Sequence, residues 1–118
     1  QHRLDVALFE SYPNIEAIDE REQRELAEVA RAENVLLERM QGLEERRAGL
    51  VAETEFYKER EVPNDITAAI AALETEIATY GRLLEAKKKE GGEVRARYET
   101  DRVRYRDLLN RGFSGLNR

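Results

Sequence analysis

Apolar side chains recur along the first half of the chain with the spacing of a coiled coil. Between residues 22 and 57, positions separated alternately by four and three residues form two rows. One row is polar only at Glu22, and its later members are apolar: Val29, Leu36, Leu43, Leu50 and Tyr57. The other row mixes apolar and polar residues. This alternation is that of a heptad seam, so the pattern predicts an amphipathic helix over residues 15–60.

The same spacing returns after Pro63. Seam positions from Ile66 to Leu108 keep their register without a slip, which predicts a second helix over residues 66–110. Between the two seams, proline ends a helix, and either Asn64 or Asp65 is suited to cap the next one. Residues 61–65 are therefore predicted to form a turn.

Folding the chain at this turn brings the two apolar seams together. Tyr57 then lies opposite Ile66, and Leu50 lies opposite Leu73. We therefore expect an all-α fold, namely a long antiparallel two-helix coiled-coil hairpin with a short N-terminal helix. Residues 1–118 are treated as a single helical domain.

The two chain ends are predicted to meet at the open end of the hairpin. Leu4, Leu8 and Phe9 indicate a short helix over residues 3–11, which Pro13 separates from the first long helix, and Asn14 is a suitable cap for that long helix. The short helix is expected to cover an apolar surface at the other terminus, formed by Leu108, Leu109, Phe113 and Leu116. Residues 111–118 are expected to form a tail, with Gly112 and Gly115 ending the second arm.

Several seam positions do not fit an ideal coiled coil. Gly91 and Gly92 indicate either a weakened but continuous helix or a hinge. Arg47 occupies a seam position, where an unpaired charge would be costly if buried. Glu33 and Lys87 lie in adjacent layers of the folded hairpin, so they form either a cross-arm ion pair or two side chains that extend to solvent.

Composition narrows the chemistry open to this chain. The 118 residues are 38% charged and 41% hydrophobic, with no cysteine and no tryptophan, which excludes disulfides and cysteine nucleophiles. No apolar run reaches the length of about 18 residues that a membrane-spanning helix needs, so no membrane insertion is expected. His2 is the only histidine, and no nucleotide-binding or metalloprotease motif occurs. We expect a protein that is not an enzyme and that uses no cofactor.

Charge is distributed unequally between the arms. Residues 14–38 hold eight acidic and three basic residues, whereas residues 86–111 hold nine basic and five acidic residues. Antiparallel folding places these segments side by side. The arginines and tyrosines between Arg95 and Arg106 would also suit nucleic acid, but the whole chain carries a net charge of −5. Pairing within the chain is therefore favoured, and no nucleic-acid partner is expected.

Three carboxylates gather at the predicted tip of the hairpin. Glu59, Glu61 and Asp65 are suited to Mg²⁺ or Ca²⁺ by ligand type, but their spacing matches no calcium-binding loop. A solvated acidic turn is the favoured interpretation, with no bound metal. The tip also resembles the acidic coiled-coil tip that bacterial transcript-cleavage factors insert into RNA polymerase, although the globular domain of those factors is missing. The alternative function is therefore a cytoplasmic regulator that acts through this tip on a large enzyme such as RNA polymerase.

A two-helix coil buries only one stripe on each helix, so further burial by association is expected. A secondary apolar row is predicted beside the seam, formed on the first arm by Ala30, Leu37, Val51 and Phe56 and on the second by Ala69, Leu83 and Ala86. Leu37, Val51, Phe56 and Leu83 are the candidate self-association residues. Packing two hairpins through this row would give a homodimeric four-helix bundle.

Two segments carry a resemblance to known proteins. Residues 8–16 read Leu-Phe-Glu-Ser-Tyr-Pro-Asn-Ile-Glu, and residues 102–109 read Arg-Val-Arg-Tyr-Arg-Asp-Leu-Leu. With the charged hairpin and the Val62-Pro63 turn, they resemble a set of uncharacterised proteobacterial proteins expected to be exported. The resemblance implies a helical hairpin in a periplasmic or exported location, and it transfers no catalytic residues. The expected function is a protein-protein interaction or scaffolding module of the bacterial envelope with an unknown protein partner.

Overall fold

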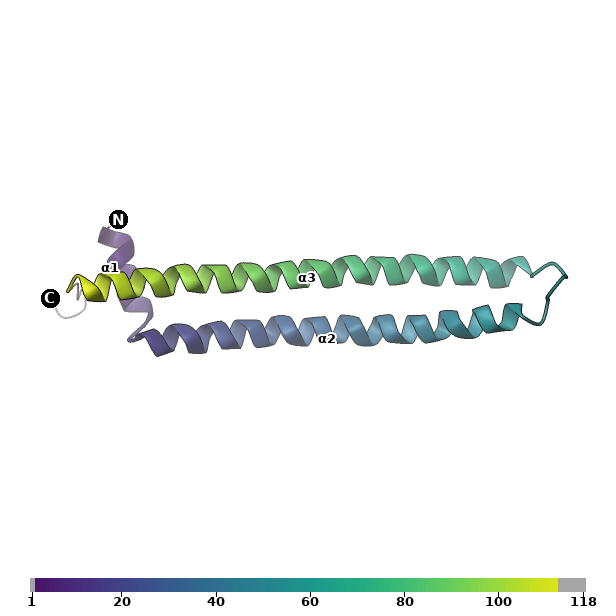
Figure 1. Ribbon diagram of the computed structural model, residues 1–118, viewed down its shortest axis with the longest axis horizontal. Helices are drawn as coiled ribbons and strands as arrows, with labels where there is room; N and C mark the ends of the chain where they lie inside the picture. Colours follow the sequence, from purple (N-terminus) through teal and green to yellow (C-terminus); the bar gives the residue numbers. More distant parts are fainter. Residues whose placement is uncertain (1, 113–118) are drawn as a thin grey trace. The chain divides into compact units, whose positions relative to one another are not determined.

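The computed structural model describes residues 2–112 and contains three helices in that range (Figure 1). They are α1 (His2–Ser11), α2 (Ile15–Thr54) and α3 (Asn64–Asn110). The described residues include no strand. The chain divides into two compact units, which we call the terminal unit (Gln1–Ala30 with Lys89–Arg118) and the loop unit (Arg31–Lys88). In each unit, a segment of α2 runs antiparallel to a segment of α3 (Figure 1), which confirms the all-α helical hairpin.

The terminal unit contains a continuous apolar core to which all three helices contribute. Phe9 of α1 lies against Tyr105 of α3, with ring centroids 4.6 Å apart. Ile18 and Leu108 are 0% and 2% exposed, respectively, and belong to the same core. The predicted docking of the N-terminal helix is confirmed for Leu108. Leu109 is 48% exposed instead, and Phe113 and Leu116 lie outside the described residues.

Polar groups fix how the chain enters α2 within the terminal unit. The backbone N–H of Ala17 donates to Oδ1 of Asn14 at 2.8 Å, so Asn14 satisfies one of the free amides in the first turn of the helix. The Tyr105 hydroxyl donates to the backbone carbonyl of Tyr12 at 3.1 Å. The predicted cap at Asn14 is therefore confirmed, and Tyr105 holds the connection between α1 and α2 in place.

The charge pairing predicted between the arms is present in the terminal unit. Arg102 on α3 contacts Asp19 at 2.7 Å and Glu22 at 2.8 Å, both on α2. Arg97 pairs with Glu25 of α2, and Arg104 contacts Asp5 of α1 at 2.7 Å. The predicted pairing between the arms is confirmed for Arg97 and Arg102, whereas Arg104 pairs with the N-terminal helix instead. The hydrogen bond to the Glu22 carboxylate raises the pKa of Arg102 above its ordinary value, and this effect is larger than that of burial, which lowers the pKa. The guanidinium therefore keeps its charge.

The helix α3 runs without interruption through Gly91 and Gly92, which confirms the continuous helix. Gly91 is buried, and a Cβ placed there would lie 3.7 Å from Cγ1 of Val29 on α2. A Cβ at that distance would make an ordinary van der Waals contact, so the packing of the terminal unit does not require glycine at residue 91. After α3 ends at Asn110, Gly112 adopts a φ of 74°, the left-handed conformation expected of a helix-ending glycine. Gly115 lies outside the described residues.

The end of α2 differs from the prediction. The helix ends at Thr54 rather than at residue 60, although Tyr57 continues the apolar period. Backbone N–H groups of residues 55–57 bond three residues back, to the carbonyls of Ala52, Glu53 and Thr54. This tighter winding closes the helix, and Lys58 then takes a φ of 40°. The connecting segment is longer than the predicted turn at residues 61–65, and α3 begins at Asn64 rather than at residue 66.

Candidate functional site

The loop unit leaves much of its apolar surface in contact with solvent. Its buried hydrophobic residues are Leu43, Leu73 and Leu84. Five large hydrophobic side chains of the same unit are exposed by 41% to 76%: Val35, Leu37, Val51, Phe56 and Leu83. Among these large hydrophobic residues of the loop unit, the exposed ones outnumber the buried ones, and exposed apolar surface marks places where proteins bind one another. We therefore take the exposed surface of the loop unit as the candidate functional site.

All four predicted self-association residues lie on this exposed surface. Leu37 and Leu83 are each 47% exposed, Val51 is 41% exposed and Phe56 is 76% exposed. The prediction placed these residues in one row, and the helix geometry does not. Phe56 lies two residues beyond the end of α2, in the turn that follows it, so it is not part of a face of that helix. Leu37 and Val51 differ by only about 40° around α2, so these two share a side of the helix.

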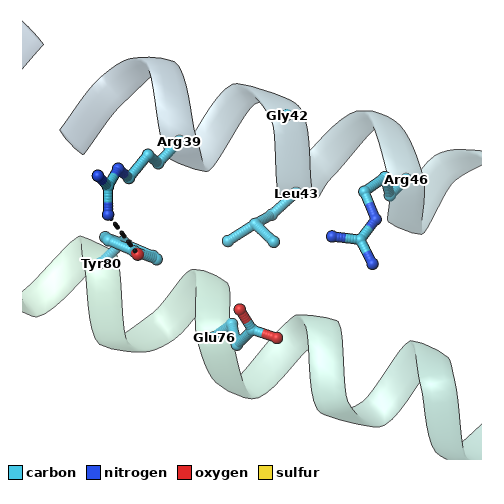
Figure 2. A pocket seen from close by; sticks show the side chains of 6 residues that line it. All are labelled: Arg39, Gly42, Leu43, Arg46, Glu76 and Tyr80. Carbon is cyan, nitrogen blue, oxygen red and sulfur yellow. Dashed lines mark hydrogen bonds between the residues drawn. The ribbon is translucent and has the colours of Figure 1, made fainter. Parts of the chain in front are cut away.

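A shallow pocket between α2 and α3 shows which side of α2 lies next to the part of α3 that carries Leu83. The pocket has a volume of about 250 Å³ and is lined by Gly42 and Arg46 of α2 and by Glu76 of α3, among others (Figure 2). Leu83 follows Glu76 by seven residues and thus lies on the same side of α3. Leu37 lies about 180° around α2 from Arg46, on the opposite side. Leu37 and Val51 therefore lie on one flank of the loop unit and Leu83 lies on the other, whereas Phe56 lies beyond the end of α2.

Gly42 lines the pocket without contributing a side chain to it. A Cβ placed at Gly42 would meet nothing within 4 Å. Beside it, Leu43 is buried, and the Arg39 guanidinium donates to the Tyr80 hydroxyl at 3.3 Å (Figure 2). The floor of the pocket is thus apolar, and its rim carries two arginines and one glutamate. An apolar depression with a charged rim suits a side chain of another protein better than it suits a small ligand.

Sequence reasoning missed part of this surface. Val35 is 49% exposed, and it precedes Gly42, Gly49 and Phe56 at intervals of seven residues. Residues seven apart lie along one line of a helix in a coiled coil. No repeat of apolar residues marks Val35, because the next positions at intervals of seven on α2 are the glycines Gly42 and Gly49 and because α2 ends before Phe56.

Among the charged residues at seam positions of the loop unit, Arg47 forms an ion pair. The Nε of Arg47 donates to Oε2 of Glu74 at 3.1 Å, and both side chains are about half exposed at 42% and 52%. Arg47 is therefore both paired and near solvent, which avoids the cost of burying an unpaired charge. Glu33 and Lys87 are half-buried, and their mutual ion pair stays a prediction.

The predicted acidic tip lies on the segment that joins α2 to α3. Glu59 and Glu61 precede Pro63, Asp65 lies in the first turn of α3, and all three carboxylates are exposed. Within residues 2–112, no group of three or more His, Asp or Glu side chains is placed to hold a metal ion. The tip thus presents separate carboxylates to solvent.

No helix in the described part of the chain is long and apolar enough to cross a membrane. Comparisons with protein-family models, with curated proteins and with solved structures found no match.

Proposed function

We propose that this chain is a non-enzymatic interaction and scaffolding module that works as a homodimer in the bacterial envelope. One observation carries the proposal, namely the concentration of exposed large apolar side chains on the loop unit. Fully burying a side chain such as Leu or Phe contributes about 1.5–3 kcal/mol. Burying this surface against another copy of the chain would gain that free energy. The isolated loop unit does not gain it, because these side chains stay in water.

The chemistry of the surface also favours a protein partner over other partners. Arg39, Arg46 and Glu76 line the pocket beside Leu43, so the surface combines both charge signs with apolar contact area. A membrane surface or a nucleic acid would favour a patch dominated by basic residues. The envelope location is supported by the resemblance of residues 8–16 and 102–109 to exported proteobacterial proteins.

Thermal unfolding at several protein concentrations tests the proposal, because unfolding of a dimer depends on concentration and unfolding of a monomer does not. We expect the melting temperature of the wild-type chain to rise with concentration. The double variants Leu37→Gln with Val51→Gln and Phe56→Gln with Leu83→Gln each alter a different part of the exposed surface, and at least one of them should lose this dependence. Val103→Gln is the matched control, because Val103 is 54% exposed on the terminal unit. A wild-type melting temperature that is independent of concentration would contradict the homodimer.

The acidic tip supports a second candidate function, regulation of a large enzyme through Glu59, Glu61 and Asp65. The observation that favours it is the exposure of all three carboxylates beside a non-helical segment. Replacing Glu61 and Asp65 together by alanine should leave folding and association unchanged under either function. Loss of activity in cells with this variant would favour the tip, whereas loss only with the apolar variants would favour scaffolding.

A further inference from the structure

The N-terminal helix α1 is held to the terminal unit through one face only. Asp5 and Phe9 lie four residues apart and are 8% and 4% exposed, respectively. Leu8 is half-buried and packs against the same core, whereas Leu4 is 66% exposed. Side chains three and four residues apart share one face of a helix. This is also the spacing with which separate amphipathic helices bind grooves of other proteins.

The surface under α1 combines an apolar floor with one basic group. The ring of Phe9 lies against Tyr105 with the centroids 4.6 Å apart, and Leu108 belongs to the same core. Beside them, Nε and one terminal nitrogen of Arg104 lie 2.8 and 2.7 Å from Oδ1 of Asp5. α1 crosses α3 where these residues of α3 lie (Figure 1). The surface therefore fits a helix that carries a carboxylate four residues before an aromatic ring.

The helical form of α1 depends on this docking. The helix contains ten residues, and isolated helices shorter than about 12–15 residues are marginal in water. By contrast, α2 and α3 contain 40 and 47 residues. Within the terminal unit they contact each other without α1, since Arg102 pairs with Asp19 and Glu22. Detaching α1 would thus leave two paired helices and expose the surface that includes Tyr105 and Leu108.

We propose that the surface under α1 is a binding site for a helix of a partner protein, and that α1 occupies this site as a built-in competitor. The partner helix carries an acidic residue four residues before an aromatic residue, as α1 does at Asp5 and Phe9. The site lies within the terminal unit, so the proposal goes beyond the homodimer, which concerns the loop unit. Either proposal can fail without the other.

Hydrogen exchange of the wild-type chain tests whether α1 opens by itself. Local opening exposes the amides of one element while the rest of the chain stays folded. The amides of residues 6–11 should therefore be at least about tenfold less protected than those next to Ile18 and Leu108. The degree of protection gives the ratio of closed to open α1. Equal protection of all these amides would mean that α1 opens only on global unfolding, which would overturn the proposal.

A peptide with the sequence of residues 1–11 is the probe for the partner helix. In the chain, the double variant Asp5→Ala with Phe9→Ala releases the chain's own α1. Titrating this isotope-labelled variant with millimolar peptide should shift the amide resonances around Tyr105 and Leu108. The wild-type chain should bind the peptide more weakly, by the ratio of closed to open α1 that hydrogen exchange gives, because only the open form has a free site.

Variant peptides test the recognised chemistry. Phe9→Ala in the peptide should abolish binding at these concentrations, because the ring is the main apolar contact. Asp5→Ala should weaken binding about tenfold, because hydrogen bonds to a charged group are lost. Leu4→Ala is the matched control, since Leu4 is 66% exposed, and it should change the affinity by less than about twofold.

Three outcomes would overturn the proposal. The first is a folded double variant that binds no peptide, and the second is equal binding of all the peptides. The third is a wild-type dimer that becomes a monomer in the double variant, because α1 would then dock on a second copy rather than hold a site for a partner. If the double variant loses its helical content, hydrogen exchange and peptide titration of the wild-type chain decide in its place.

Discussion

Truncating Leu108 to alanine tests the account of the terminal unit, where the two chain ends share one core. Leu108 is 2% exposed and packs in the cluster that includes Phe9 and Tyr105. Removing buried methyl groups loses their transfer free energy and leaves a cavity, which together cost 2–5 kcal/mol for Leu→Ala. We expect a loss of about 3 kcal/mol for Leu108→Ala, since the site is enclosed by all three helices and has little room to collapse.

Leu109 is the matched control, because it is the next residue on the same helix and is 48% exposed. Leu109→Ala should cost about 0.5–1 kcal/mol, since only about half of its side chain leaves water on folding. Urea denaturation followed by circular dichroism at 222 nm measures both variants, at one protein concentration so that association does not differ between samples. The melting temperature of Leu108→Ala should fall by about 10 °C or more, and that of Leu109→Ala by less than half as much.

The reasoning would be refuted by equal losses at the two positions, because burial alone distinguishes them. A loss below about 1 kcal/mol at Leu108 would be just as damaging, since it would mean that the site is not enclosed by α1. The slope of free energy against urea concentration should stay unchanged, because the substitution does not alter how much surface unfolding exposes.

Three further predictions concern the polar groups of the terminal unit. Arg102→Met should destabilise the chain by about 2 kcal/mol, because the mostly buried carboxylate of Glu22 loses its partner; adding Glu22→Gln should recover part of that loss in the same urea assay. Asn14→Ala should cost about 1 kcal/mol through loss of the helix cap, measured by thermal unfolding. Burial raises the pKa of Tyr12 and of Tyr105 above the ordinary value of 10.0. The unfolded chain then loses these protons at lower pH than the folded chain, so stability should be constant below pH 10 and fall as pH rises through the raised values. Tyr105→Phe should reduce that fall. Tyrosinate absorbance at 295 nm should develop at higher pH in the folded chain than in the unfolded chain.

Much of the fold could be predicted from the sequence because heptad spacing survives over long stretches. The period from Ile66 to Leu108 carries through Gly91, and α3 is continuous there. The cap at Asn14 follows from a polar residue directly before an apolar period. Pairing of Arg102 with acids of α2 follows from the opposite charges of two segments that antiparallel folding brings together.

Other features depend on contacts that spacing does not encode. The end of α2 at Thr54 carries no glycine or asparagine signal, and Tyr57 keeps the apolar period beyond it. The helix ends there because backbone bonds tighten and Lys58 adopts a left-handed conformation. Which flank a residue occupies also depends on how the two helices face each other. Leu83 was grouped with Leu37 for this reason, although the pocket beside Glu76 separates their sides.

Sedimentation equilibrium of the unmodified chain tests the central claim, that the loop unit covers its exposed surface with a second copy. The method returns mass without assuming a shape. One chain has a mass of 13.7 kDa. The account predicts a reversible approach to twice that mass as concentration increases into the micromolar range. A single species of 13.7 kDa at every concentration, with helical content intact, would contradict it.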